Sequence, residues 1–433
     1  MTWISWRWKY RQGSAKGEKT IISLIEAKNY KSIKYVRQDL KMMQVLIGPN
    51  ASGKTTFLDV PELVKDIVSD GIDAAVTKRG GSLVDLTHYE NANDIEIGIE
   101  LRLPDELIIQ SGGARLDTAR YEIKIGIRGE DQIIINENLW IKPQSVKMKR
   151  YGLFPIEMSE NNDVIHPRSQ KGRAPKGWVK IIGKTESGND YFKSERTGWN
   201  SQFRFGNKKS AISNVPEDYE KFPIAIWVRN YFTLGIQTIM LDSKAMRKSS
   251  PRIGAREFLP DGSNLPRVLS DFKKNKLYSR WLKHIRSFLG DIVDIDVVSR
   301  PEDNSQYLSV IYSTGEVPAW LVSDGTLRLI ALTMLPYLDN QNRTYLIEEP
   351  ENGIHPKAME AVFQSLSSSK SSQVFIASHS PVILSMAEPV DLLCFAKTIS
   401  GYTDVISGSD HPQLRDWKGR VSLDVLFASG VLG

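Results

Sequence analysis

The sequence has a single cysteine, Cys394, among 433 residues. One cysteine cannot form a disulfide within the chain, and it cannot supply the thiolate cluster of a structural zinc or iron–sulfur site. No stretch approaches the roughly 18 consecutive apolar residues of a membrane span. The N-terminal residues 1–20 are basic and aromatic but lack the continuous apolar core of a secretory signal. We therefore expect a reducing, cytoplasmic location and no membrane partner.

Strong compositional bias is also missing. Hydrophobic residues make up 41% of the chain and charged residues 25%, which is typical of soluble globular domains and excludes a disordered or collagen-like chain. At about 150 residues per domain, the length corresponds to about three domains, or to one large domain with an insertion. The function must therefore be inferred from motifs.

Positive charge is concentrated in one segment. The net charge is only +6, but residues 144–210 contain 14 Lys and Arg against 6 Asp and Glu. Cationic side chains neutralise phosphates and aromatic faces stack on bases. Three interpretations stay open, namely a solvated insertion without specific contacts, a DNA-binding surface within 142–215, or a docking surface for a protein. The interleaved aromatic residues are Trp178, Tyr191, Phe192, Trp199, Phe203 and Phe205.

The pattern of apolar residues predicts strands and a helix in the first third of the chain. Residues 21–33 and 42–47 are predicted as two strands separated by a polar turn, the second ending at a glycine. Residues 55–70 have the apolar spacing of a helix. Between residues 94 and 140, three alternating stretches predict antiparallel strands joined by short turns.

The last third of the chain alternates between the two kinds of element. An amphipathic helix is predicted over 267–292, with Gly290 as its stop signal, and two strands follow it. A helix from about residue 326 then precedes two strands, 344–349 and 372–378, and each strand is followed by a helix. Alternation at this spacing predicts a parallel sheet with crossover connections.

Residues 48–55, GPNASGKT, match the phosphate-binding loop pattern GxxxxGK[ST]. The match lies between a predicted strand and a predicted helix, which is the context that this motif requires. Its glycines allow backbone N–H groups to point at phosphate oxygens, and the start of the helix adds its positive dipole end. Lys54 is predicted to reach the terminal phosphates and Thr55 to bind Mg²⁺. The predicted nucleotide-binding residues here are Gly48, Pro49, Asn50, Ala51, Ser52, Gly53, Lys54, Thr55 and Thr56.

Acidic residues end the predicted strand at 344–349. In parallel sheets, the carboxyl ends of the strands form the edge where nucleotides bind. Glu348 is predicted to hold the metal and Glu349 to act as the catalytic base that deprotonates water. The first acid of such a strand is usually Asp. Because Glu is longer by one methylene, metal binding by Glu349 stays an alternative.

Two further motifs follow the same logic. Ser323 and Gly325, in the sequence SDGTLR, are predicted to cap a helix and to leave a bare backbone amide, which together favour an anion. His379, in SHSP, follows the strand next along the chain. It is therefore predicted to lie at the same sheet edge and to donate a hydrogen bond to the terminal phosphate.

In this order, GPNASGKT, SDGTLR, LIEEPENGIHP and SHSP resemble the motifs of the ABC-type ATPase domain shared by RecF-like, SMC-like and OLD-family proteins. KNYKSI and DGSNLPRVL resemble further parts of the stand-alone ATPases of this group. The resemblance covers most of the chain. It implies an α/β fold, a two-lobed P-loop NTPase head with a mixed or parallel core sheet, an antiparallel β subdomain and a basic insertion. The expected boundaries are an N-terminal extension (1–20), an N-terminal lobe (21–141), the insertion (142–215) and a C-terminal lobe (216–433).

The resemblance also implies an activity. Such proteins bind ATP with Mg²⁺ and hydrolyse it in a homodimer or higher homo-oligomer that sandwiches two nucleotides. By matching position, Lys54 and Thr55 of one copy would face Ser323 and Gly325 of the other, with Glu349 as the base and His379 as the switch histidine. Glu349 argues against a scaffold that binds ATP without hydrolysing it.

Stand-alone ATPases of this group serve bacterial anti-phage systems such as Septu, PARIS and some retrons, where they pair with a separate effector, often a nuclease. Only 54 residues follow His379 (433 minus 379), so we expect no Toprim nuclease domain here. The resemblance therefore implies a regulatory ATPase subunit that senses a trigger or controls an effector. The alternative is a RecF-like DNA-binding ATPase in repair or recombination.

Overall fold

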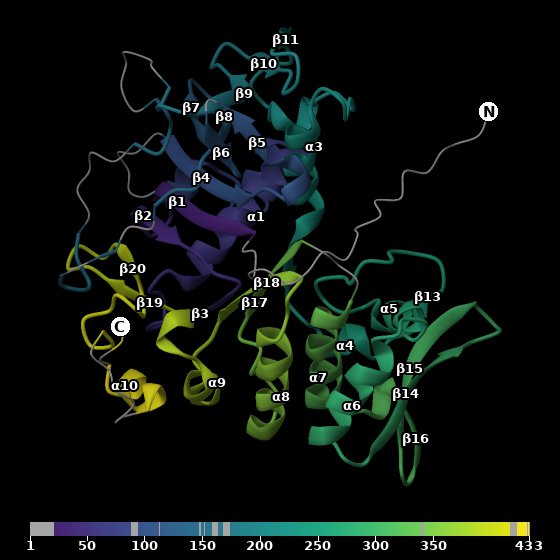
Figure 1. Ribbon diagram of the computed structural model, residues 1–433. Helices are drawn as coiled ribbons and strands as arrows, with labels where there is room; N and C mark the ends of the chain where they lie inside the picture. Colours follow the sequence, from purple (N-terminus) through teal and green to yellow (C-terminus); the bar gives the residue numbers. More distant parts are fainter. Residues whose placement is uncertain are drawn as a thin grey trace, which may run out of the picture.

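The computed structural model describes residues 21–87, 94–111, 113–146, 149–150, 152–157, 163–167, 174–338, 342–415, 422–430 and 432. The expected N-terminal extension, 1–20, lies outside the described residues. Two large sheets form the framework, and a smaller sheet lies at the side of the second one (Figure 1). No helix among the described residues is both long enough and apolar enough to span a bilayer.

The first large sheet is antiparallel and has eight strands in the order β11-β10-β9-β8-β7-β4-β1-β2. Three of its strands match the stretches predicted between residues 94 and 140. The expected single strand at 21–33 is wrong, because the chain reverses at Lys31, whose φ is 47°, and β1 pairs with β2. The bounds are β1 (Ile22–Tyr30), β2 (Ile33–Asp39), β4 (Asp94–Arg102), β7 (Thr118–Arg128), β8 (Asp131–Lys142), β9 (Val179–Lys184), β10 (Asn189–Lys193) and β11 (Asn200–Arg204).

The segment 142–215, for which the sequence predicted no strands, contributes three strands to this sheet. β9 continues the ladder from β8, and β10 and β11 follow through short turns. The strands form because Ile182 and Phe192, which are paired across β9 and β10, are buried on one face of the sheet. A small hairpin, β5 (Ile109–Ser111) and β6 (Ala114–Leu116), and helix α3 (Pro223–Asn230) complete this part of the molecule.

The second large sheet has six strands in the order β12-β17-β18-β3-β19-β20. Its first five strands are parallel, as the alternation of strands and helices predicted, and β20 is antiparallel to β19. The bounds are β3 (Met43–Ile47), β12 (Ile236–Ile239), β17 (Arg343–Glu348), β18 (Ser372–Ala377), β19 (Leu392–Lys397), β20 (Thr403–Ser407), α1 (Lys54–Asp70), α2 (Ile72–Thr77), α8 (Pro356–Ser367), α9 (Pro381–Met386) and α10 (Leu423–Ala428).

The third part carries a smaller antiparallel sheet packed on helices. The single helix predicted over 267–292 is wrong, since the chain forms two helices with a turn between them. The turn lets the rings of Phe272, Tyr278 and Trp281 pack against one another with centroids 5.5–5.8 Å apart. The bounds are α4 (Ser243–Met246), α5 (Leu265–Phe272), α6 (Tyr278–Phe288), α7 (Asp324–Met334), β13 (Ser250–Pro251), β14 (Ile292–Ser299), β15 (Ser305–Tyr312) and β16 (Gly315–Pro318).

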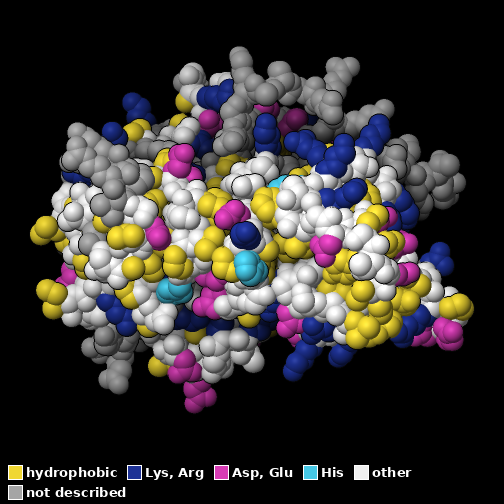
Figure 2. Space-filling model, turned by 90° about the horizontal axis from the view of Figure 1, so that it is seen from below, with side chains coloured by type: hydrophobic (Ala, Val, Ile, Leu, Met, Phe, Trp, Pro, Cys, Tyr) yellow, Lys and Arg dark blue, Asp and Glu magenta, His cyan; other side chains and the backbone are white. Residues whose placement is uncertain are grey.

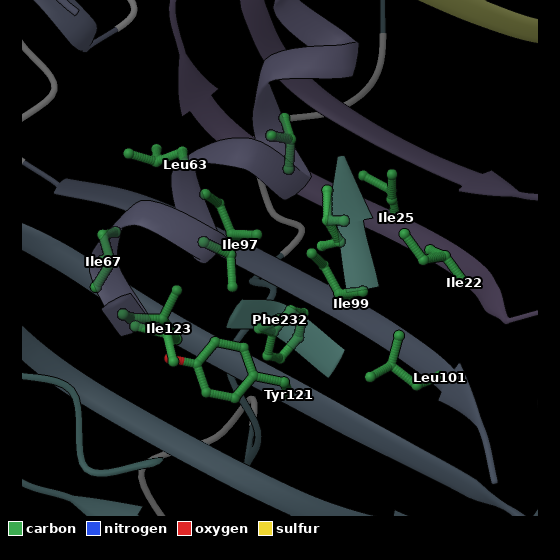
Figure 3. Close-up of a cluster of buried hydrophobic side chains, with 14 of the residues drawn as sticks. Ile22, Ile25, Leu63, Ile67, Ile97, Ile99, Leu101, Tyr121, Ile123 and Phe232 are labelled. Atoms are coloured by element: carbon green, nitrogen blue, oxygen red, sulfur yellow. The ribbon is translucent and has the colours of Figure 1, made fainter. Parts of the chain in front are cut away.

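Helix α1 is buried between the two large sheets. Figure 3 shows Leu63 and Ile67 of α1 against Ile97 of β4 and Ile123 of β7. The other side of α1 packs on the six-stranded sheet, whose opposite face forms a second core with α5 to α8. Burial on both sides fixes the position of α1, and with it the loop from which α1 starts.

Candidate functional site

The loop between β3 and α1 has two positions, Gly48 and Gly53, that only glycine can occupy without strain. Gly48 and Gly53 have φ angles of 149° and 103°. A Cβ at Gly53 would lie 2.1 Å from Thr403 Oγ1, and a Cβ at Gly48 would lie 2.3 Å from the carbonyl oxygen of Phe395. The loop thus lies tightly against β19 and β20, and in this chain both positions require glycine.

Lys54 closes this loop. Its Nζ donates hydrogen bonds to the carbonyl oxygens of Gly48 and Pro49, at 2.8 and 2.9 Å, and the residue is only 7% exposed. Burial lowers the pKa of the Lys54 ammonium to about 8, although Glu349 and Glu348 act in the opposite direction. Phosphate oxygens would give this buried cation the stronger acceptors that it lacks.

A cavity of about 440 Å³ lies in front of the loop. The structure brings most of the residues predicted for the nucleotide site to this one cavity. Gly48, Pro49 and Ser52 belong to the loop but do not line the cavity. Ser52 is 1% exposed, and its Oγ has no hydrogen-bond partner among the described residues. The predicted residues in the lining are Asn50, Ala51, Gly53, Lys54, Thr55, Thr56, Glu348, Glu349 and His379.

Thr55 and Glu348 meet on the floor of this cavity. Thr55 Oγ1 donates to Glu348 Oε2 at 3.1 Å. Burial raises the pKa of Glu348; the hydrogen bond from Thr55 opposes this effect, and the charge of Glu349 adds to it. These two oxygen donors fit Mg²⁺, which prefers oxygen ligands and keeps several positions for water and phosphate. Among the described residues, no cluster of three His, Cys, Asp or Glu side chains could hold a metal ion alone.

Glu349 follows directly in a strained conformation. Its φ is 46°, and its N–H donates to the carbonyl oxygen of Ala377 at 2.8 Å, which ties the end of β17 to the end of β18. The Glu349 side chain is exposed to the cavity and accepts a hydrogen bond from Asn352 Nδ2 at 2.7 Å. Strain of this kind in an ordered loop often marks a functional position.

His379 is held by its backbone. Glu351 Oε1 accepts hydrogen bonds from Ser378 Oγ at 2.8 Å and from the His379 N–H at 3.0 Å. Burial lowers the pKa of His379, and the charge of Lys54 lowers it further. A neutral imidazole has one N–H, which allows it to donate a hydrogen bond into the cavity.

Ser323 and Gly325 lie in a different cavity, of about 580 Å³. The Ser323 Oγ caps α7 by accepting a hydrogen bond from the Thr326 N–H at 3.2 Å, as predicted. A Cβ at Gly325 would lie 2.7 Å from the carbonyl oxygen of Gly353. The two cavities have no lining residue in common. Within one chain, the structure therefore does not bring Ser323 and Gly325 to Lys54.

Arg247 and Arg328, which the sequence did not single out, fix the start of α7. One nitrogen of the Arg247 guanidinium, Nη2, lies 2.5 Å from Asp324 Oδ1 and donates to the carbonyl oxygen of Val322 at 2.8 Å. Arg328 donates to Ser243 Oγ at 3.2 Å. The two arginines thus anchor the segment around Ser323 to α4. No local pattern could have indicated these contacts.

Other residues that line the cavity at the P-loop, and one that holds the loop in place, were missed. Lys31, Ser32 and Lys397 line it. Thr403 Oγ1 lies 2.9 Å from the carbonyl oxygen of Ser52 and 2.8 Å from Ser32 Oγ, and so links the loop to β20 and to the β1–β2 turn. Only Lys31 and Ser32 carried a signal, because they belong to the segment KNYKSI.

One protein family matches most of this chain. A family model described as "AAA domain, putative AbiEii toxin, Type IV TA system" matches residues 44–385, well over half of the chain. A search of curated proteins gives no significant match.

One solved structure has the same fold, and two others have lower scores. An SMC head bound to the C-winged helix domain of ScpA has a TM-score of 0.52 at 15% identity, over 89% of this chain and 98% of that one. The SMC head of Thermotoga maritima has a TM-score of 0.42 at 12% identity, over 90% and 99% of the two chains. An SMC head derived from Pyrococcus furiosus has 0.44 at 14%, over 89% and 96%. The chain therefore belongs to the AAA-domain family that the matching model describes, and it has the α/β fold of an SMC-like ABC ATPase head with a P-loop.

Proposed function

We propose that this chain binds ATP and Mg²⁺ in the cavity at the P-loop and hydrolyses ATP to ADP and phosphate. The observation that carries the proposal is the convergence of Lys54, Thr55, Glu348, Glu349 and His379, from three distant parts of the sequence, on that single cavity. Loop glycines and a buried lysine suit phosphates, and an exposed carboxylate suits a base.

Each side chain has a proposed role. Lys54 neutralises charge on the terminal phosphates, and His379 donates a hydrogen bond to the departing phosphate. Glu349 orients a water molecule and accepts its proton as the water oxygen bonds to phosphorus and the bond to the ADP oxygen breaks. Thr55 and Glu348 would hold Mg²⁺, which when bound neutralises phosphate charge.

We infer that two copies complete each site. Ser323 and Gly325 have the geometry of an anion site but lie in a cavity of their own, so they can reach a nucleotide only on a second chain. Trp320 and Leu321, which precede Ser323, are 45% and 71% exposed. Figure 2 shows the molecule from below. On that surface, hydrophobic side chains gather on the side where β14 to β16 lie in Figure 1. An apolar surface beside Ser323 supports a homodimer or higher homo-oligomer.

The proposed biological role is that of a regulatory subunit that controls a separate effector, such as a nuclease, in anti-phage defence. Two findings support a partner protein. The matching family is described as "AAA domain, putative AbiEii toxin, Type IV TA system", and the SMC head with the same fold is described as bound to a domain of ScpA. The basic segment 142–215 supports the alternative, a RecF-like DNA-binding ATPase. Adjacent genes separate these roles, since a neighbouring nuclease favours defence and neighbouring replication genes favour repair.

Steady-state ATP turnover of Glu349→Gln tests the chemistry. Loss of a general base lowers rates by about 10²- to 10⁴-fold, whereas the variant should still bind ATP and accumulate as an ATP-bound dimer in size-exclusion chromatography. Glu360→Gln is the matched control, because Glu360 is an exposed residue of α8. Turnover of Glu349→Gln at the parental rate would show that another group is the base.

A further inference from the structure

The strand β11 is an edge of the eight-stranded sheet as far as the described residues extend. Among them it pairs with β10 alone, and all five of its residues are exposed. In Figure 1, β11 lies at the top of the molecule, at the opposite end from α8 and α9. An exposed edge of this kind presents unpaired backbone N–H and C=O groups and is available to a ligand.

Three aromatic side chains are exposed at this edge. Trp199 is 80% exposed, Phe203 45% and Phe205 49%. Phe203 and Phe205 lie two residues apart, and their rings are stacked with centroids 5.5 Å apart and an interplanar angle of 22°. The inner ring, Phe203, also contacts the buried Phe192, with centroids 6.1 Å apart. Single exposed aromatics are ordinary, but three within seven residues form a patch that a ligand would cover.

The charges around this patch are sorted by burial. Lys193, Arg196 and Arg204 are exposed, and none of them has an ion-pair partner among the residues that the structure describes. The two acids within residues 189–205 are turned inward. Asp190 is buried and pairs with Lys184, and Glu195 accepts hydrogen bonds from two N–H groups at the start of α3, at 2.8 and 2.9 Å. The exposed charges of residues 189–205 are therefore positive.

We propose that β11 and the β10–β11 turn bind single-stranded nucleic acid. Stacking on Phe203, Phe205 and Trp199 requires bases whose faces are free, and these faces are covered in a duplex. The register of β10 and β11 places Lys193 and Arg204 on the face opposite Phe203. A single nucleic-acid strand that curves around this edge can therefore place its bases on the aromatic face. Its phosphates would then lie near Arg196, Arg204 and the free backbone N–H groups.

Single-stranded nucleic acid would then be the trigger in the proposed function. Its role as a trigger rests on that function, whereas its binding to β11 does not. β11 belongs to the eight-stranded sheet, whereas the P-loop follows β3 of the six-stranded sheet. We therefore expect single-strand binding without bound ATP. An acidic protein partner is the competing occupant. Such a partner would also be attracted by the three cations, but it has no bases to stack on the aromatic rings.

Fluorescence anisotropy of the full chain with labelled oligo-deoxythymidine, and with a duplex of equal length, tests the proposal. We expect the single strand to bind tighter than the duplex and to be released as salt rises. Trp199→Ala, whose side chain is 80% exposed, should weaken single-strand binding about tenfold, and Phe203→Ala with Phe205→Ala more than tenfold. Arg204→Glu should weaken it and flatten the salt dependence.

Ile253→Ala and Lys276→Glu are the controls, since they change an exposed apolar side chain and an exposed lysine in other parts of the chain. Equal or tighter binding of the duplex would overturn the proposal, as would aromatic variants that bind like the parent or a parent that binds no oligonucleotide. Lys54→Ala should bind the single strand normally. Single-strand binding by a chain without ATP turnover would therefore refute the proposed function but not this site.

Discussion

At the scale of the residue, Gly53 shows how closely the P-loop fits its surroundings. Gly53→Ala should destabilise the fold and abolish ATP binding, because the new Cβ would lie 2.1 Å from Thr403 Oγ1 at a φ of 103°. Gly81→Ala is the matched control, since Gly81 has a φ of 93° with nothing within 4 Å of its Cβ position. The control should lose only the about 1–2 kcal/mol of left-handed strain. Urea unfolding and binding of a fluorescent ATP analogue measure both effects. Equal losses of stability would show that the contact with Thr403 relaxes.

The proposed catalytic residues also differ in how far the sequence could define them. Lys54 and Thr55 follow from one contiguous pattern, whose backbone geometry is local. The division of work between Glu348 and Glu349 could not be settled from sequence, because it depends on which side chain faces Thr55. Their placement, with Glu348 on Thr55 and Glu349 exposed to the cavity, favours the predicted roles, which stay a proposal. Thr403 gave no signal at all, since its contacts join residues more than 350 positions apart.

At the scale of the element, a network of buried charged side chains lies on one face of the eight-stranded sheet, on β7 and β8. Glu122 is fully buried and accepts hydrogen bonds from Arg120 Nε, Trp140 Nε1 and the His166 N–H, at 2.6, 3.0 and 2.9 Å. Burial alone would raise its pKa, but the hydrogen bonds from His166 and the charge of Arg120 outweigh burial and lower the pKa to about 2. Such a network is costly to break, because a buried charge would lose its partners.

This network should make the fold sensitive to acid. The pKa of Glu122 is depressed, so its contribution is present above its ordinary value of 4.5 and is lost as the pH falls toward 2. The contribution is of the order of 3 kcal/mol. Glu122→Gln should be less stable at pH 7 and should lose less stability than the parent between pH 5 and pH 3, as measured by urea unfolding. Glu360→Gln should keep the parental pH dependence. An unchanged acid response in Glu122→Gln would place the sensitivity elsewhere.

Elements with a regular local pattern could be predicted from the sequence, whereas elements that depend on a chain reversal or on pairing with a distant strand could not. The alternating pattern of residues 94–140 predicted three strands correctly, and the spacing of 55–70 predicted α1, because both depend on local periodicity. β2 was missed because the chain reverses at Lys31, an ordinary residue with positive φ. The strands of 179–204 were missed because they owe their place to pairing with β8, which a polar, basic composition does not reveal.

At the scale of the whole molecule, the separation of the two cavities determines how the protein can work. The P-loop cavity holds the proposed base, whereas Ser323 and Gly325 lie in the other cavity. If two copies share each site, a chain with a damaged P-loop still offers an intact Ser323 to its partner. Each nucleotide would then be acted on by Glu349 of the chain that binds it and by Ser323 of the other chain.

Mixing two inactive variants tests this arrangement. Lys54→Ala lacks phosphate binding, and Ser323→Arg blocks the surface that faces the partner's nucleotide, so each alone should hydrolyse little ATP. In the mixture, half of the dimers would have one intact site, which should restore about a quarter of the parental turnover. Lys54→Ala mixed with Glu349→Gln is the control, because the base and the P-loop act from the same chain and no intact site can form. Recovery in the control, or none in the test mixture, would contradict a site completed by the second copy.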